Sequence, residues 1–168
     1  FSYDPLADRA LLSRSIPFPY KYLSTPTGPG TSPCQFYGDD EINVCPRANE
    51  PLGRRRYWPI YARAQELGLP LGIHVGGYGG HAPTGGGWPS FYVEEHQSNA
   101  HTMAAQLTSL VLEGIPERFP NLKIVFIEGG FGWIPSTTWR MDRHFEAFRS
   151  EVPHLKRKPS EYVKDHFW

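Results

Sequence analysis

Two polar residues stand at the ends of apolar runs, where a parallel sheet would place catalytic groups. His74 lies near the end of the run Leu71–Val75, and Glu128 directly follows the run Leu122–Ile127. Parallel α/β folds bind ligands at the carboxyl ends of their strands, so both side chains are expected at one mouth of the sheet. An imidazole there can bind a divalent metal, and a carboxylate can bind metal or transfer a proton. Spacing alone leaves two alternatives open, a hydrogen-bonded core histidine and a strand-end carboxylate that points into water.

A long glycine-rich loop, residues 76–88, follows the first of these runs. It lacks the Lys-Ser/Thr pair of a phosphate-binding loop and the glycine spacing of a dinucleotide site, which makes nucleotide binding a poor hypothesis. Its length predicts either an active-site loop with aromatic walls or a plain solvent-exposed connection. In the first case, Tyr78 and Trp88 are expected to contact the substrate.

The other histidines are weaker candidates for a functional site. His96 and His101 are five residues apart, so on a helix they project roughly 140° away from each other and lack the i, i+4 spacing of a metal pair. His96 is expected in the first turn of its helix, where it either donates to a substrate or is simply solvated. The histidines that lie among charged residues are expected at the surface; these are His144, His154 and His166.

Three successive βα units are expected to position these residues. The expected strands are Ile42–Cys45, Leu71–Val75 and Leu122–Ile127. The segments of helical period begin near Pro59, Glu94, Pro135 and Ser160, and the first two end near Gly68 and Gly114. This alternation predicts an α/β fold with a parallel sheet and right-handed crossovers. Three strands close no barrel, since a complete one needs about 250 residues, so the units are part of a barrel or an open sheet.

The first 43 residues differ in composition from the rest. Prolines recur among Ser, Thr and Gly over residues 13–38, where they remove backbone donors, so no regular element is expected there. We therefore divide the chain into an irregular Pro/Gly-rich segment, residues 1–43, and a folded domain, residues 44–168. The sequence begins with Phe rather than Met, which indicates a partial sequence.

Overall charge and hydrophobicity limit the kinds of partner that the protein is expected to bind. Seventeen Lys and Arg balance seventeen Asp and Glu, so the net charge is zero and no bulk field attracts nucleic acid or an anionic membrane. The apolar runs are far shorter than the roughly 20 residues that cross a bilayer. Two cysteines, Cys34 and Cys45, without a secretory signal are typical of reduced thiols and a cytoplasmic location. We expect a small-molecule substrate.

Several segments together resemble the amidohydrolase-related family, which includes the aminocarboxymuconate-semialdehyde decarboxylase-like enzymes. The resemblance covers about residues 44–168, and its most specific parts are the strand LPLGIHVG, the strand and turn ERFPNLKIVFIEGGFGWIP, and the helix WRMDR. The shorter matching segments are NEPLG at residues 49–53 and YWPIY at residues 57–61. Residues 1–43 show no match to the family.

The resemblance implies an incomplete (β/α)8 TIM barrel that retains about three central βα units, similar to the fourth, fifth and sixth. It also implies a divalent metal, commonly zinc, held by an H-x-H or E-x-H pair on the first strand, a His on the fifth and an Asp on the eighth. His74 matches the fifth-strand ligand, whereas the other ligands have no counterpart here. Many members carry a His where this sequence has Glu128 and use it for proton transfer or substrate activation. Because Glu128 departs from that pattern, two roles are open for it: acid or base in catalysis, or orientation of the groups beside the metal.

The implied function is part of a metal-dependent hydrolase or non-oxidative decarboxylase that acts on a small organic substrate. The metal would activate a water or bind the substrate directly. The alternative is a truncated, inactive fragment or pseudo-enzyme, because one ligand out of about four does not hold a catalytic metal. The chain alone is therefore expected to be inactive, and assembly into a homo-oligomer stays open.

Overall fold

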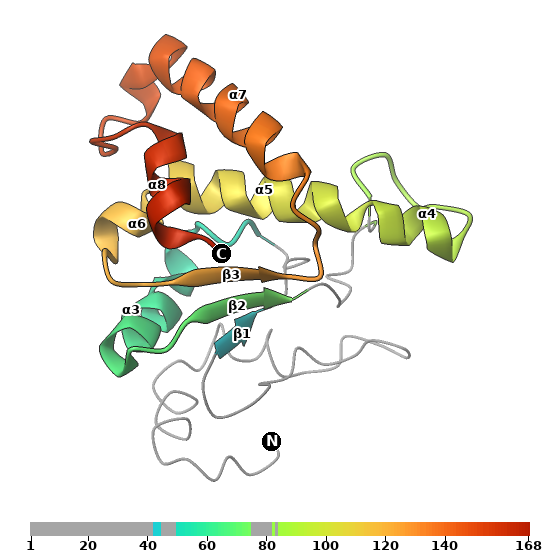
Figure 1. Cartoon of the computed structure of the whole chain (residues 1–168), viewed down its shortest axis with the longest axis horizontal. Coiled ribbons are helices and arrows are strands. Elements are labelled where there is room, and N and C mark those ends of the chain that lie inside the picture. The colour runs from blue at the N-terminus through green and yellow to red at the C-terminus, as the bar shows by residue number, and fades with distance from the viewer. Residues whose placement is uncertain (1–41, 45–49, 75–81, 83) are drawn as a thin grey trace, which may run out of the picture.

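The computed structural model describes residues 42–44, 50–74, 82 and 84–168; Tyr78, Cys45 and residues 1–41 lie outside them. The elements in chain order are β1 (Ile42–Val44), η1 (Arg55–Tyr57), α3 (Trp58–Leu67), β2 (Leu71–His74), α4 (Tyr92–Gln97), α5 (Asn99–Leu112), α6 (Ile115–Arg118), β3 (Ile124–Ile127), α7 (Trp133–Ala147), η2 (Arg149–Glu151) and α8 (Pro159–His166). Figure 1 shows α5 running along the strands, with α7 and α8 packed on α5. Within these residues, no helix is both long and apolar enough to span a bilayer.

The sheet is parallel, and its strands follow the chain order β1-β2-β3. The last residues of the chain continue this order, because Phe167 forms a parallel bridge with Ile124. Trp168 N donates to the Ile124 carbonyl at 2.9 Å, and Phe126 N donates to the Trp168 carbonyl at 2.8 Å. Parallel neighbours joined by helices confirm the predicted α/β class, and all three strands lie within one or two residues of the predicted runs.

Helix α3 begins and ends as its sequence predicts. Pro59 occupies the first turn, where its missing N–H needs no intrahelical partner. Gly68 adopts a left-handed conformation (φ 67°), and its N–H donates to the Gln65 carbonyl at 3.1 Å. A residue without Cβ adopts this conformation without steric cost, so the chain can turn sharply into β2.

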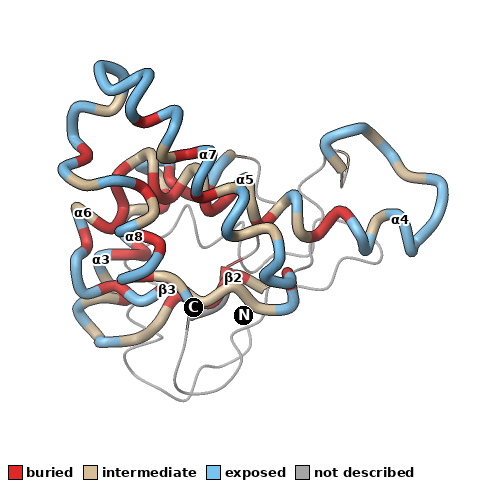
Figure 2. The backbone as a smooth tube through the Cα atoms, turned by 45° about the horizontal axis from the view of Figure 1, so that its top comes forward, coloured by how far each residue is buried: buried red, intermediate tan, exposed pale blue. Residues whose placement is uncertain are grey.

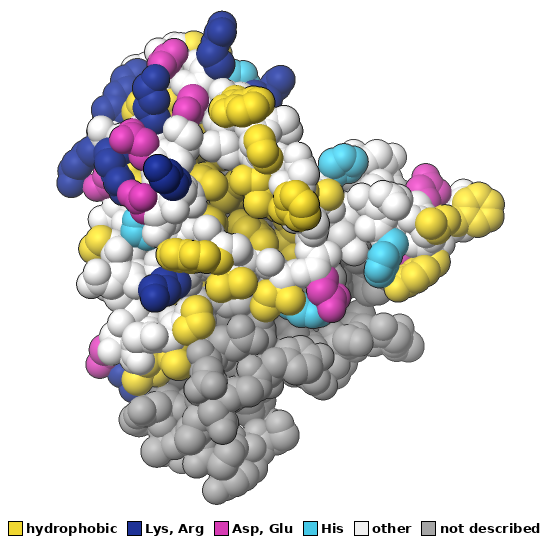
Figure 3. All heavy atoms as spheres, in the orientation of Figure 1, with side chains coloured by type: hydrophobic (Ala, Val, Ile, Leu, Met, Phe, Trp, Pro, Cys, Tyr) yellow, Lys and Arg dark blue, Asp and Glu magenta, His cyan; other side chains and the backbone are white. Residues whose placement is uncertain are grey.

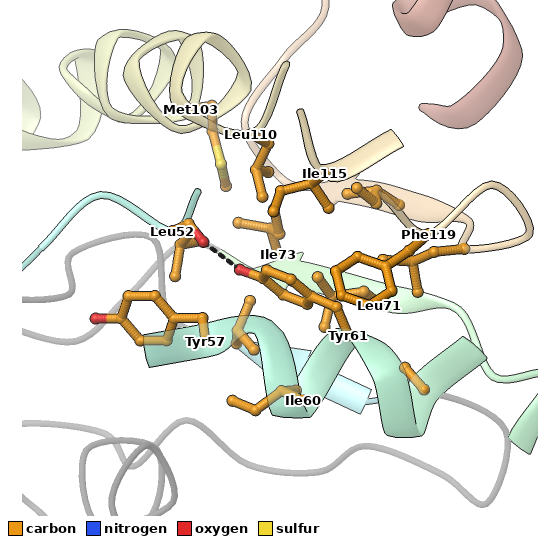
Figure 4. Packing of buried hydrophobic residues seen from close by; sticks show 14 residues of the cluster. Leu52, Tyr57, Ile60, Tyr61, Leu71, Ile73, Met103, Leu110, Ile115 and Phe119 are labelled. Carbon is orange, nitrogen blue, oxygen red and sulfur yellow. Dashed lines mark hydrogen bonds between the residues drawn. The ribbon is translucent and has the colours of Figure 1, made fainter. Parts of the chain in front are cut away.

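A first cluster of buried apolar side chains lies between the sheet, α3 and α5 (Figure 4). Tyr61 is fully buried in it, packs edge-on against Phe119 at 6.0 Å between ring centroids, and donates from Oη to the Leu52 carbonyl at 2.5 Å. Burial raises the pKa of Tyr61 well above its usual value of 10, and the nearby Tyr57 adds to the rise. The phenol therefore stays protonated and keeps its hydrogen bond to the loop before α3.

A second cluster joins α5, α7 and α8. Its buried members are Leu107, Val111, Met141, Phe145, Leu155, Tyr162 and Val163. Figure 2 shows buried positions along α5 and also on α3, α6 and α8, whereas α4 is almost wholly exposed. Helix α5 thus contributes to both clusters, since Met103 and Leu110 belong to the first and Leu107 and Val111 to the second.

The single helix expected from Glu94 to Gly114 is instead two helices. The chain bends at Ser98, whose hydroxyl donates to the Glu95 carbonyl at 2.6 Å and so completes the end of α4. A serine hydroxyl competes in this way with the regular helical ladder. His96 consequently lies in the last turn of α4, not in the first turn of a longer helix.

One of the histidines expected at the surface is buried. His144 and His154 are exposed as predicted, but His166 is only 8% exposed, and its Nδ1 lies 3.3 Å from the Leu122 carbonyl. It follows Tyr162 by four residues, so it lies on the face of α8 that packs into the domain. Its charged sequence neighbours lie on the other faces of α8, so the prediction that His166 lies at the surface was wrong.

Tyr162 holds a partly buried hydrogen-bond network that should make stability depend on pH. Its hydroxyl donates to Glu117 and accepts from the backbone N–H groups of Lys156 (3.0 Å) and Arg157 (3.1 Å). The bond from Tyr162 is the main cause of the lowered pKa of Glu117, and Lys156 adds to it. A carboxyl whose pKa is lowered on folding stabilises the fold above its unfolded value, and this contribution is lost as pH falls through the folded pKa.

We therefore expect Tyr162→Phe to lower the free energy of unfolding by about 1–3 kcal/mol at neutral pH, because buried donors lose their acceptor. The difference from wild type should shrink as the pH falls below the ordinary Glu value of 4.5, where the wild type loses the Tyr162–Glu117 contribution that the variant already lacks. Urea unfolding between neutral and acid pH measures it, with the exposed Tyr92→Phe as control. A difference that stays constant with pH would refute the coupling.

Candidate metal and acid–base site at the strand ends

The structure brings His74 and Glu128 together at the carboxyl ends of neighbouring strands. His74 is the last residue of β2, and Glu128 directly follows β3. His74 Nε2 lies 3.6 Å from Glu128 Oε2, with side-chain exposures of 32% and 67%. The imidazole is thus partly enclosed and the carboxylate largely open to solvent, so an incoming ligand can reach both atoms.

The alternation of side chains along β2 decides which face of the sheet carries His74. Leu71 and Ile73 are fully buried in the first apolar cluster, beneath the helices. Successive residues of a strand point to opposite faces, so His74 shares the other face with Gly72. The helices and the candidate site therefore lie on opposite faces of the sheet.

Glu128 has an unusual backbone conformation. Its φ is 62°, and the other residues with positive φ in the described part of the chain are glycines. A side chain in the left-handed region costs about 1–2 kcal/mol relative to the usual conformations. Such strain persists where the surrounding structure fixes it, and it is frequent at functional sites. Here the turn after Ile127, the partner of His74 in the sheet, leaves the carboxylate beside the imidazole.

The pair fits a divalent metal ion in chemistry and in spacing. Imidazole nitrogen and carboxylate oxygen are common ligands of zinc, and imidazole also suits other transition metals. Two ligand atoms of a tetrahedral ion with bonds of about 2.1 Å lie about 3.4 Å apart, close to the 3.6 Å between Nε2 and Oε2. No group of three or more His, Cys, Asp or Glu side chains able to hold a metal occurs among the described residues. His74 and Glu128 can thus supply two ligands, and a tight site needs more.

Trp88 and His96 lie on an arm, residues 84–97, that extends beyond the carboxyl ends of the strands (Figure 1). Trp88 is 71% exposed, and the His96 ring contacts that of Tyr92 at a tilt of 40°, with 5.0 Å between centroids. Helix α4 has no buried residue, and Figure 3 shows apolar side chains gathered on the arm. Two of the three predicted substrate contacts therefore lie at the same end of the sheet as His74 and Glu128, and the third, Tyr78, lies outside the described residues.

Comparison with known proteins gives one family and a set of related folds. A family model described as amidohydrolase matches residues 41–168. The fold is similar to that of an amidohydrolase from Mycobacterium avium subsp. paratuberculosis K-10, with 22% identity and a TM-score of 0.63 over 76% of this chain and 34% of that one. No curated protein sequence matches the chain.

Two further solved structures have the same fold. A protein from Staphylococcus aureus assigned as an amidohydrolase has 23% identity and a TM-score of 0.55, over 77% of this chain and 43% of that one. The 5-carboxyvanillate decarboxylase from Sphingomonas paucimobilis has 23% identity and a TM-score of 0.54, over 76% and 38%. The chain thus spans less than half the length of each of these proteins, and the likeness concerns the fold.

Proposed function

We propose that this chain, which belongs to the amidohydrolase family, supplies part of the active site of a metal-dependent hydrolase or non-oxidative decarboxylase. The substrate is a small organic molecule. The observation that carries the proposal is the His74–Glu128 pair, 3.6 Å apart at the ends of adjacent parallel strands. In α/β folds this edge of the sheet is where catalytic groups gather.

The fold supports a place for this chain within a (β/α)8 barrel. Its three strands and the terminal bridge follow chain order, without the reversal that marks a doubly wound sheet. His74 lies on the face opposite the helices, which is the interior face of a barrel. The described βα units are the central part of that barrel, and the remaining strands complete the metal site.

His74 is the metal ligand of this segment, through Nε2. Glu128 lies next to His74 and serves as a general base that takes a proton from a water, or as a general acid that returns one to the product. Alternatively, Glu128 is a second ligand of the same metal ion. When bound, a divalent ion such as Zn²⁺ supplies a positive charge that polarises a water or a substrate oxygen. Trp88, His96 and Tyr78 contact the organic part of the substrate from the arm and the loop before it.

Activity in the protein that contains the complete barrel tests the proposal. Purified protein, with Zn²⁺ or Mn²⁺ added, would be assayed for CO₂ release from aromatic carboxylates, the substrate class named for the Sphingomonas relative. Parallel assays would follow the hydrolysis of amides and lactones. We expect metal-dependent turnover in one of the two classes, and none from the 168-residue chain alone. Turnover that persists in chelator-treated protein would contradict the proposal.

Charge removal at Glu128 separates its role from that of a solvated surface carboxylate. Glu128→Gln keeps the size of the side chain but removes the charge beside His74, so Zn²⁺ affinity should fall about 10–100-fold, as for other groups that support a metal ligand. Titration calorimetry measures the affinity. Glu66→Gln is the matched control, because Glu66 is 68% exposed and pairs with Arg63 on α3. Equal Zn²⁺ affinities of the two variants would show that Glu128 does not contribute to metal binding.

A further inference from the structure

A cleft on the outer surface lies at the opposite end of the sheet from His74 and Glu128. It has a volume of about 480 Å³ and is formed by η1 and the start of α3, the end of α5, α6 and the segment before α8. Helix α6 precedes β3, so this end is the amino-terminal end of the strands (Figure 1). Among the residues that line it are Arg55, Trp58, Glu113, Glu117, Arg118 and Lys156.

Trp58 brings two guanidinium groups into this cleft. The guanidinium carbon of Arg118 lies 4.0 Å from the Trp58 ring centroid, and that of Arg55 lies 5.4 Å from it. The indole is itself fixed, because its Nε1 donates to the Gly53 carbonyl at 3.0 Å. Cation–π contact orients both cations but does not neutralise their charge.

The carboxylates of the cleft are already occupied by other groups. Glu113 pairs with Arg54 at 3.3 Å, and Glu117 pairs with Lys156 at 3.1 Å and accepts a hydrogen bond from Tyr162. The lowered pKa of Glu117, caused mainly by Tyr162 and then by Lys156, agrees with a carboxylate that is fully ionised and supplied with donors. His154 also lines the cleft, and its Nε2 donates to the Leu112 carbonyl at 2.7 Å.

Arg55 and Arg118 are left as the uncompensated charges of the cleft. Neither has a carboxylate partner among the residues that the structure describes. On the surface of α7 and α8, by contrast, positive and negative side chains alternate (Figure 3), and pairs such as Lys158–Glu146 and Arg157–Asp165 are 2.6–2.7 Å apart. Two guanidinium groups held near one ring without carboxylate partners give the cleft a positive potential, which favours a bound anion.

We propose that this cleft binds a dianionic oxyanion, namely the phosphate group of a small metabolite. Guanidinium groups present paired N–H donors that match the oxygens of a phosphate. The two charges of the anion balance the two arginines, and the cleft is large enough for an organic part beside the phosphate. The site is separate from the strand-end pair, so its ligand is an effector rather than the substrate. The inference does not depend on the proposed function.

Titration of the full chain with inorganic phosphate tests this site. Calorimetry would be done in chelator-treated protein at constant ionic strength, so that the anion cannot bind through a metal and general screening does not change. We expect Arg55→Gln and Arg118→Gln each to weaken phosphate binding about tenfold or more, because each variant loses a charge-assisted hydrogen bond to the anion. Arg118→Lys should have an intermediate phosphate affinity, since an ammonium group keeps the positive charge but lacks the paired, planar N–H donors of a guanidinium.

Arg140→Gln, which removes an exposed arginine of α7, is the matched control and should bind phosphate like the wild type. His74→Ala should also keep phosphate binding, which separates this site from the strand-end pair. Arg55 is exposed, so Arg55→Gln is the variant least able to disturb folding, and a circular dichroism spectrum equal to that of wild type would verify it. Unchanged binding in Arg55→Gln, equal losses in Arg140→Gln, or chloride binding as tight as phosphate would each overturn the proposal.

Discussion

In the His74→Ala variant of the protein that contains the complete barrel, Zn²⁺ affinity is expected to fall by at least about 100-fold, beyond the 10–100-fold typical of a lost supporting group. The imidazole is the nitrogen ligand of the pair, and the carboxylate of Glu128 alone would compete poorly with water for the ion. Titration calorimetry with Zn²⁺ at neutral pH measures the loss, and metal analysis after dialysis provides an independent check. The expected order of affinity is wild type, then Glu128→Gln, then His74→Ala.

His101→Ala is the control for this experiment, because His101 is an exposed histidine on α5. Its removal should leave Zn²⁺ binding unchanged. If His74→Ala and His101→Ala lose the same affinity, the zinc that was measured bound to surface histidines in general. The strand-end pair would then be structural.

Gly53→Ala should be the most destabilising of the small substitutions considered. A Cβ at this position would stand 2.4 Å from the Ser109 carbonyl oxygen and 2.8 Å from Glu113 Cβ, both on or next to α5. The loop that contains Gly53 cannot simply move away from α5, because two hydrogen bonds hold it there. Leu52 N donates to Gln106 Oε1 at 2.8 Å, and Gly53 N donates to Ser109 Oγ at 3.0 Å. We expect a loss of at least about 1–3 kcal/mol in the free energy of unfolding, a large share of the usual total of about 5–15 kcal/mol.

Urea denaturation of Gly53→Ala and Gly132→Ala measures this effect against a matched control. Gly132 has no atom within 4 Å of an added Cβ, and its φ is −60°, a conformation that alanine adopts readily. The control should stay within about 0.5 kcal/mol of the wild type. Equal stability of the two variants would show that the loop and α5 are not in rigid contact.

The parts of the fold that depend on neighbours in sequence could be predicted. Pro59 and Gly68 mark the ends of α3 because a missing N–H and a missing Cβ act locally. The closeness of His74 and Glu128 could also be predicted, since each ends a parallel strand and the carboxyl ends of such strands share one edge.

The parts that depend on distant packing could not be predicted. His166 is buried because α8 packs into the domain, which nothing in its charged surroundings signals. Arg118 reaches Trp58 from 60 positions away in sequence, so the residues near Trp58 in sequence gave no sign of the cleft. The place of Glu128 after an apolar run marked the end of a strand, but it did not indicate that the backbone of Glu128 would adopt the left-handed conformation.

The bridge between the chain end and β3 links two parts of the molecule in hydrogen exchange. The Phe126 amide is bonded to the Trp168 carbonyl, and the Phe167 ring stacks on Phe126 at 5.8 Å between centroids. That amide can exchange with solvent as soon as residues 167–168 lift from the sheet, even while β2 and β3 stay paired. Its protection therefore reports the free energy of docking residues 167–168 on β3, a local opening that is separate from global unfolding.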